Sequence, residues 1–192
     1  QDERLNIHAG DVLKLPWDNI LSCPPYTLVA NLPYNISTQI VFKLLDHKDL
    51  FSRMVLMFQR EVGERLVASP GGKDYGILSV LCQLWFDIRT VTLVRPGAFN
   101  PPPRVDSIVL EFVPLEQPRV DPIDSDLFRQ VVKGAFTQRR KTLKNSFKAA
   151  GFSVEAIDAV LEMTQIDPGR RGETLTLSEF SHLTDAFQRK KI

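Results

Sequence analysis

The first 113 residues alternate between strand-like segments, some with a two-residue period and some continuously apolar, and segments with the spacing of a helix. The strand pattern covers residues 5–9, 26–30, 54–58, 91–94 and 105–113. Helical spacing covers residues 36–45, 61–68 and 75–85, and Ser37 is the expected N-cap of the first of these helices. Strands that alternate with helices predict an α/β fold with a mostly parallel sheet and helices on both faces. The last two strands, joined by a Pro-rich turn without a helix, predict an antiparallel edge.

Beyond residue 114 the pattern is helical only. Residues 115–123 have the composition of a linker, with prolines and charged residues. The expected helix caps further on are Asp124 or Ser125, Ser153, and a capping box formed by Thr176 and Glu179, while Gly151 is an expected helix end. The pattern therefore divides the chain into an α/β domain over 1–114, a linker over 115–123 and a small all-helical domain over 124–192.

The composition narrows the class of protein. With 192 residues, of which 43% are apolar and 24% charged, the chain has the composition of a soluble globular protein. It holds no run of 18 apolar residues and no visible secretory signal, so we expect a cytoplasmic protein without a membrane partner. Two distant cysteines and three scattered histidines lead us to expect neither a disulfide scaffold nor a metal site. The start at Gln1, next to an apolar alternating segment, indicates a start inside a domain.

Basic residues concentrate in one stretch, although the net charge of the whole chain is only +1. Residues 127–154 contain no acidic residue but seven basic ones, namely Arg129, Lys133, Arg139, Arg140, Lys141, Lys144 and Lys148. If residues 129–148 form one helix, most of these side chains lie within an arc of roughly 100°. A one-sided basic stripe is typical of a surface that binds nucleic-acid phosphates. The alternative is a solvated helix face.

The segment Asn31-Leu32-Pro33-Tyr34 follows a buried strand, so it lies at the sheet edge where open α/β folds bind ligands. An exocyclic amine of a nucleobase is a poor nucleophile because its lone pair is conjugated with the ring. The Asn31 side-chain oxygen and a backbone carbonyl of the turn, that of Leu32, could accept its two N–H groups and aim the lone pair at an electrophilic methyl group. Tyr34 could stack on the base. The alternative is a helix-entry turn with a packed tyrosine.

Two further loops are candidates at the same edge. Asp11 follows the strand expected over 5–9, and its carboxylate could accept hydrogen bonds from an adenine amino group or serve only as a turn residue. Three consecutive prolines after Asn100 hold Phe99 in a stiff loop. Its ring could cover the other face of a flipped base. The alternative is a rigid hairpin connection in which Phe99 is buried.

Three motifs together resemble one enzyme family. They are Asn31-Leu32-Pro33-Tyr34-Asn35-Ile36-Ser37, the Pro-rich loop Phe99–Ser107, and Phe136-Thr137-Gln138-Arg139-Arg140-Lys141-Thr142-Leu143. In this order they resemble the bacterial small-subunit (16S) ribosomal RNA adenine dimethyltransferases, over essentially the whole chain. The resemblance implies a Rossmann-like methyltransferase that uses S-adenosylmethionine. It would dimethylate N6 of two adjacent adenines near the 3′ end of small-subunit rRNA during ribosome biogenesis.

The resemblance also implies roles for single residues. The catalytic residues are Asn31, Leu32, Pro33, Tyr34 and Phe99, of which the two aromatic residues stack on the target adenine. Asp11 and Asn31 border the cofactor. The helical domain with its seven basic residues binds rRNA, and the small ribosomal subunit is the expected partner of a monomeric enzyme.

The chain departs from the family pattern in its first part. The Gly-rich loop after the first strand and the acidic residue after the second strand, which hold the cofactor, are absent. We therefore expect the first strands of the catalytic domain to be missing, so that this chain alone is inactive or binds the cofactor weakly. Two alternatives stay open: a non-enzymatic rRNA-binding or ribosome-assembly module, and a large-subunit rRNA adenine dimethylase that shares the catalytic turn.

Overall fold

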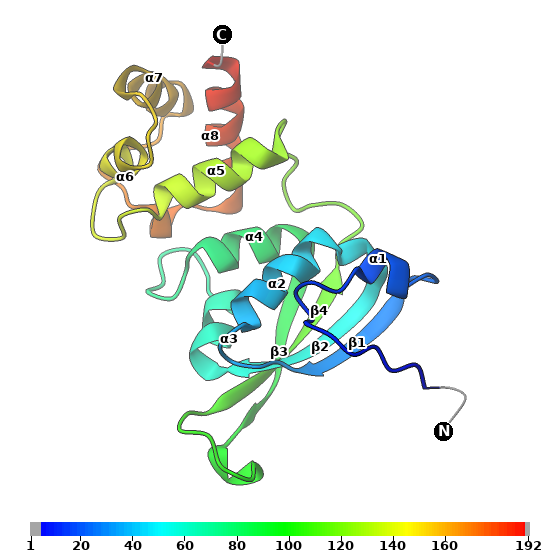
Figure 1. Ribbon diagram of the computed structural model, residues 1–192. Helices are drawn as coiled ribbons and strands as arrows, with labels where there is room; N and C mark the ends of the chain where they lie inside the picture. The colour runs from blue at the N-terminus through cyan, green and yellow to red at the C-terminus, as the bar shows by residue number, and fades with distance from the viewer. Residues whose placement is uncertain (1–4, 191–192) are drawn as a thin grey trace.

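The computed structural model describes residues 5–190. Its sheet has four strands, β1 (Tyr26–Asn31), β2 (Phe51–Gln59), β3 (Phe86–Val94) and β4 (Ser107–Pro114), in the order β1-β2-β4-β3 (Figure 1). Only β1 and β2 are parallel, whereas β4 is antiparallel to both of its neighbours. The expectation of a mostly parallel sheet is therefore wrong for these strands. The reason is that the final hairpin returns β4 into the space between β2 and β3, so one reversed strand creates two antiparallel pairings.

The helices of the first half are α1 (Trp17–Ile20), α2 (Ser37–Asp46), α3 (Arg60–Val67) and α4 (Ile77–Trp85), with short 3₁₀ turns at Lys48–Leu50 and Pro96–Ala98. They cover the sheet face that carries Leu56 and Leu110, both fully buried (Figure 1). The opposite face carries Val29, whose side chain is 75% exposed. Within residues 5–190 the helices thus cover one face, not both as expected, and they place the apolar core on that side.

The strand expected over residues 5–9 is not formed. Leu5 and Ile7 are 64% and 77% exposed. A strand needs a neighbour that pairs with its backbone N–H and C=O groups. No neighbour is present for this segment in the part of the chain that the structure describes, so alternation alone did not make it a strand.

The second half is helical, with α5 (Ser125–Ala135), α6 (Leu143–Ala149), α7 (Val154–Thr164), a 3₁₀ turn at Gly172–Thr174, and α8 (Leu177–Lys190). These helices gather beyond α4, at the end of the molecule opposite the β3–β4 hairpin (Figure 1). The expected caps are confirmed: Asp124 accepts the Leu127 N–H at 2.8 Å, and Ser153 accepts the Ala156 N–H at 3.2 Å. Gly151 follows α6 with φ +92°, a backbone conformation that favours glycine.

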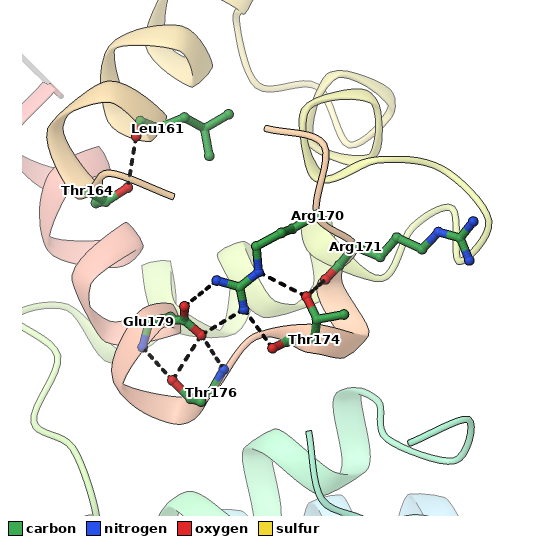
Figure 2. A network of polar contacts seen from close by, with 7 residues as sticks. All are labelled: Leu161, Thr164, Arg170, Arg171, Thr174, Thr176 and Glu179. Atoms are coloured by element: carbon green, nitrogen blue, oxygen red, sulfur yellow. Dashed lines mark hydrogen bonds and ion pairs between the residues drawn. The ribbon is translucent and has the colours of Figure 1, made fainter. Parts of the chain in front are cut away.

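The capping box at the start of α8 is also confirmed, and it belongs to a larger network (Figure 2). Thr176 Oγ1 accepts the Glu179 N–H at 3.2 Å, while Glu179 Oε2 accepts the Thr176 N–H at 2.8 Å. The Arg170 guanidinium donates to both carboxylate oxygens of Glu179 and to the Thr174 carbonyl. This hydrogen bonding lowers the pKa of the Glu179 carboxyl. The network fixes the loop between α7 and α8 from which Arg171 points away into solvent (Figure 2).

The segment 115–123 packs along the sheet and α4. The Leu115 N–H donates to the Trp85 carbonyl at 2.9 Å, and the Arg119 N–H donates to the Leu84 carbonyl at 3.0 Å. The Arg119 side chain reaches Asp87 at 3.0 Å. Although its composition is that of a linker, the segment is held by backbone hydrogen bonds and joins the helical half to the rest through fixed contacts.

Candidate active site and RNA interface

The turn after β1 is fixed by its backbone. The Leu32 N–H donates to the Met57 carbonyl at 3.2 Å, which continues the pairing with β2 beyond the end of β1. The Ile36 N–H donates to the Pro33 carbonyl at 3.2 Å and closes the turn before α2. The Leu32 side chain is buried, which anchors the turn in the core. The turn thereby has one defined position at the carboxyl end of a sheet strand.

Two hydrogen-bond acceptors in this turn are without a protein partner among residues 5–190. One is the side-chain oxygen of Asn31, which is exposed, and the other is the backbone carbonyl of Leu32. They belong to consecutive residues, so both lie at the same end of β1. Asn31 and Leu32 therefore offer the pair of acceptors that an exocyclic amine with two N–H groups would need.

Tyr34 is held at both ends. Its carbonyl accepts the Ser37 hydroxyl at 3.2 Å, and its own hydroxyl lies 2.7 Å from Ser107 Oγ. The ring is half-buried, so part of it faces solvent beside the turn. The expectation that Ser37 caps α2 is wrong. Ser37 is the first residue of the helix, and its hydroxyl donates to the turn instead of accepting a helix N–H.

Phe99 lies in the loop between β3 and β4, directly after the 3₁₀ turn, and this hairpin projects from the sheet (Figure 1). The Phe99 N–H donates to the Pro96 carbonyl at 3.1 Å, and the side chain is half-buried. The aromatic contacts among the described residues do not include a Phe99–Tyr34 pair. Tyr34 is instead linked to the far end of the same Pro-rich motif, through Ser107.

A cavity of about 490 Å³ lies beside Asn31. Its walls are mainly apolar and come from the segment before β1, from β1 and its turn, and from α2 and β2. The residues that line it are His8, Val12, Leu15, Trp17, Ile20, Leu21, Tyr26, Thr27, Leu28, Ala30, Asn31, Leu32, Pro33, Ile40 and Phe51. Its size and apolar walls suit a small flat ligand, with the Asn31 carboxamide as a polar group at the wall.

Asp11 stands just outside this wall, next to Val12. Its Oδ1 accepts the Leu13 N–H at 3.0 Å, so the carboxylate closes the turn that follows residue 10. Its other oxygen lies 3.8 Å from the Lys14 ammonium, at an exposed position. The structure thus supports the turn role of Asp11 directly and places the residue near, but not among, the cavity-lining residues.

Lys43 of α2 holds the loop that carries Asp11. Its ammonium donates to three backbone carbonyls, those of Val12, Leu13 and Leu15, at 3.2, 2.9 and 2.7 Å. It also lies 4.8 Å from the centre of the Trp17 ring. Three donors meet three acceptors, so the ammonium is fully satisfied. Lys43 thereby connects α2, which begins after the Tyr34 turn, to the loop with Val12, Leu13 and Leu15, and it fixes the part of the cavity wall that this loop supplies.

The basic stretch is not one helix. α5 ends at Ala135 and α6 begins at Leu143, so the expectation of a single helix through 129–148, and the arc derived from it, is wrong. Residues 137–142 contain no apolar side chain, and a helical turn there would have no face to bury. Thr142 instead caps α6 by accepting the Asn145 N–H at 3.5 Å. The basic residues are therefore distributed over two helices and the turn between them.

Three of the seven basic side chains make intramolecular contacts. Arg129 pairs with Asp46 of α2 at 2.7 Å, Lys144 pairs with Asp158 of α7 at 2.5 Å, and Arg139 donates to the Lys73 carbonyl. The other four are exposed and have no ion-pair partner among residues 5–190; these are Lys133, Arg140, Lys141 and Lys148. These four are the ones available to phosphates, and we call them the open basic set.

The comparison with known proteins identifies the family. The family described as ribosomal RNA adenine dimethylase matches residues 1–188. The chain belongs to this family.

Its relatives in the dimethylase family are longer than the chain. It is 60% identical to the ribosomal RNA small subunit methyltransferase A of Syntrophotalea carbinolica, over 97% of this chain and 71% of the relative. It is 57% identical to the protein of the same name from Geobacter sulfurreducens, over 94% of this chain and 67% of the relative. Each match thus spans nearly the whole of this chain, and the chain spans about 70% of the length of these two relatives.

Solved structures support the fold assignment. A dimethyladenosine transferase from Plasmodium falciparum matches with a TM-score of 0.82 and 29% identity, over 99% of this chain and 74% of that one. A 23S rRNA methyltransferase, ErmE, matches with a TM-score of 0.60 at 20% identity, over 88% of this chain and 69% of that one, which is a likeness of fold. The four-stranded mixed sheet with its helices is therefore a fold of dimethyladenosine transferases.

Two residues of the candidate site were not assigned a role from the sequence. Ser107 lies inside the Pro-rich motif, but only the structure brings its hydroxyl to Tyr34. Lys43 carries no sequence signal, since its partners are backbone carbonyls about 30 residues earlier. Residues 5–190 contain no group of three or more His, Cys, Asp or Glu side chains arranged for a metal ion, and none of their helices is long and apolar enough to cross a membrane.

Proposed function

We propose that this chain carries the target-base site and the RNA-docking surface of an enzyme that dimethylates N6 of two adjacent adenines near the 3′ end of small-subunit rRNA. Membership of the dimethylase family supports the reaction class. The observation that carries the proposal is the pair of unpartnered acceptors, Asn31 Oδ1 and the Leu32 carbonyl, beside the half-buried ring of Tyr34.

The two acceptors act on the geometry of the target amine. In adenine the N6 lone pair is conjugated with the ring, so attack on a methyl group requires the nitrogen to become pyramidal. Hydrogen bonds from its two N–H groups to Asn31 and Leu32 stabilise that shape and orient the lone pair. Such a base must leave its stack, and Tyr34 offers it a ring to stack on. Phe99, on the projecting hairpin, would cover the second face.

S-adenosylmethionine is the methyl donor that the family implies, and it supplies an electrophilic methyl group on a positively charged sulfur. The cavity beside Asn31 fits its flat adenine ring, because Trp17, Leu28 and Pro33 give it apolar walls. The Asp11 oxygen that is not bound to the Leu13 N–H would accept the adenine amino group at the mouth of the cavity. Lys43 would keep this wall in place.

The helical half, residues 124–192, would dock the ribosomal RNA as a separate domain. Folded RNA presents a dense array of phosphates, and affinity for it depends on exposed cations that are not already paired. The open basic set meets that condition. Its residues lie on α5, on α6 and in the turn between them, in the half of the molecule away from the Phe99 hairpin.

The test is methyl transfer to small ribosomal subunits from cells that lack this modification. The chain would be joined to the part of the Syntrophotalea carbinolica relative that it does not cover, and labelled S-adenosylmethionine would report transfer to N6. We expect label in small subunits and not in large ones. Asn31→Ala should lower the rate about 10²- to 10³-fold with little change in RNA affinity, whereas Gln39→Ala, an exposed amide on α2, is the control.

Two results would contradict the proposal. A rate for Asn31→Ala within about fivefold of the parent would remove the role of the amide. Binding of small subunits without any transfer would support an rRNA-binding or assembly module instead of an enzyme.

A further inference from the structure

The hydrogen bond between Tyr34 and Ser107 joins two segments that are 73 residues apart in the sequence. Tyr34 lies in the turn after β1, and Ser107 is the first residue of β4. Because β4 runs against β2, its first residue pairs with Gln59, the last residue of β2. The turn and Ser107 therefore meet at the same sheet edge, where the carboxyl ends of β1 and β2 lie.

Ser107 is a rigid anchor. It is fully buried, and its backbone is paired with Gln59 on one side and Val94 on the other. A serine side chain has a single heavy-atom torsion, so a residue held on both sides places its hydroxyl within narrow limits. A buried hydroxyl needs a partner, and the 2.7 Å contact with the Tyr34 hydroxyl supplies it.

We propose that Ser107 is a positioning residue for the methylation site: through the Tyr34 hydroxyl it fixes the plane of the ring on which the target base stacks. This rests on the proposed function, since it assigns the stacking role to Tyr34. The Ser37 hydroxyl holds the backbone of Tyr34 and Ser107 holds the tip of its ring, so both ends of the residue are fixed before the base arrives. A ring that is already oriented loses less freedom when a base binds.

The proposal changes the expected behaviour of Tyr34→Phe. A ring that acted only by stacking would tolerate loss of its hydroxyl. A ring held through its hydroxyl should suffer from Tyr34→Phe and from Ser107→Ala to a similar degree, about three- to tenfold each, the effect of one lost hydrogen bond. The double variant should be no worse than either single one, because the same bond is removed.

The experiment measures stacking without chemistry. The chain is mixed at saturation with a hairpin RNA that has two adjacent adenines in its loop, one of them replaced by the fluorescent analogue 2-aminopurine. Stacking on a tyrosine ring quenches its emission. We expect full quenching with the parent chain and much weaker quenching with Tyr34→Ala, in which only Phe99 is left to stack. The equilibrium constant for stacking of the bound base should fall three- to tenfold with Tyr34→Phe, Ser107→Ala and the double variant. Ser79→Ala, which removes another fully buried, hydrogen-bonded serine hydroxyl, is the matched control.

The outcomes separate the proposal from the function on which it rests. Equal quenching by the parent and Tyr34→Ala would contradict the stacking role and with it the proposed site. Loss of quenching with Tyr34→Ala but parent-like quenching with Tyr34→Phe and Ser107→Ala would overturn the role of Ser107 alone. Additive losses in the double variant, or an equal loss with Ser79→Ala, would assign the effect to general destabilisation, which thermal unfolding of each variant measures independently.

Discussion

Arg129 of α5 lies 2.7 Å from Asp46, the last residue of α2. This ion pair joins the helical half to α2, the helix that follows the turn with Asn31 and Tyr34. Both side chains are partly exposed, at 38% and 50%, so the pair is accessible to water but not to an RNA phosphate without being broken. Arg129 is therefore a link within the molecule and not a member of the open basic set.

Loss of this link should affect stability more than RNA binding. Arg129→Met keeps the long stem of the side chain but removes the charge. We expect the free energy of unfolding to fall by up to about 1 kcal/mol, the usual range for an exposed ion pair. Affinity for small subunits, measured by filter binding, should stay within about twofold. A tenfold loss of affinity with unchanged stability would return Arg129 to the RNA interface.

The open basic set should behave differently. Arg140→Gln with Lys141→Gln removes two exposed, unpaired cations from the turn between α5 and α6. We expect the affinity for small subunits to fall about tenfold, and the slope of log affinity against log salt to flatten by about two, close to one per lost phosphate contact. Binding is measured at several salt concentrations. Lys144→Gln is the matched control, because Lys144 is already paired with Asp158. Equal slopes of log affinity against log salt for the parent and the double variant would show that Arg140 and Lys141 are solvated and do not contact RNA phosphates.

Lys43 should control the wall that carries Asp11. Lys43→Met removes an ammonium that donates to three backbone carbonyls. We expect a loss of about 1.5–3 kcal/mol of stability, the range for hydrogen bonds to a charged group. Amide hydrogen exchange of residues 11–15 should also become faster. Lys14→Met is the control, since that side chain is 86% exposed on the same loop. Unchanged exchange in Lys43→Met would show that the loop is held by other contacts.

The Glu179 network should make the helical half sensitive to acid. The hydrogen bonds from Arg170 lower the pKa of the Glu179 carboxyl below its usual 4.5. A lowered folded-state pKa means that this stabilisation is present above about pH 4.5 and is lost as pH falls through the folded-state value. Urea unfolding should show Glu179→Gln less stable than the parent by about 1 kcal/mol at pH 7, with the difference shrinking below pH 4.5. A pH-independent difference would contradict this. Glu162→Gln, exposed on α7, is the control.

Local features of the fold could be predicted from the sequence because their causes are local. Asp124 and Ser153 cap helices through N–H groups three residues away, and Gly151 ends a helix by its own backbone freedom. Strand direction is different, because it depends on where the final hairpin inserts β4. The segment 5–9 alternates as a strand does but has no neighbouring strand among residues 5–190. Whether a neighbour is present cannot be read from the segment alone. The break between α5 and α6 had a signal, namely the six residues after Phe136 without an apolar side chain.

The same distinction between local causes and contacts of distant segments applies to the candidate site. The acceptors at Asn31 and Leu32 were predictable because one contiguous turn supplies both. The role of Ser107 depends on a contact across 73 residues, and that of Lys43 on carbonyls of another loop. Which basic residues stay open depended on partners such as Asp46 and Asp158, which lie on other helices. A count of charges along one segment could not distinguish the paired basic residues from the open basic set.

The position of β1 has a consequence for the local stability of the sheet. β1 is joined to the sheet by β2 alone, through a parallel pairing that is closed only after α2 has crossed over, whereas β2, β4 and β3 form a continuous antiparallel unit. A parallel pairing is slightly less stable per residue than an antiparallel one, and among residues 5–190 β1 has no second neighbouring strand. Within residues 5–190, the strand that ends in Asn31 is thus held less firmly than β2 and β4, each of which has two neighbours, and it should open more easily than they do. Whatever occupies the cavity beside it should slow that opening and protect the β1 amides from exchange first.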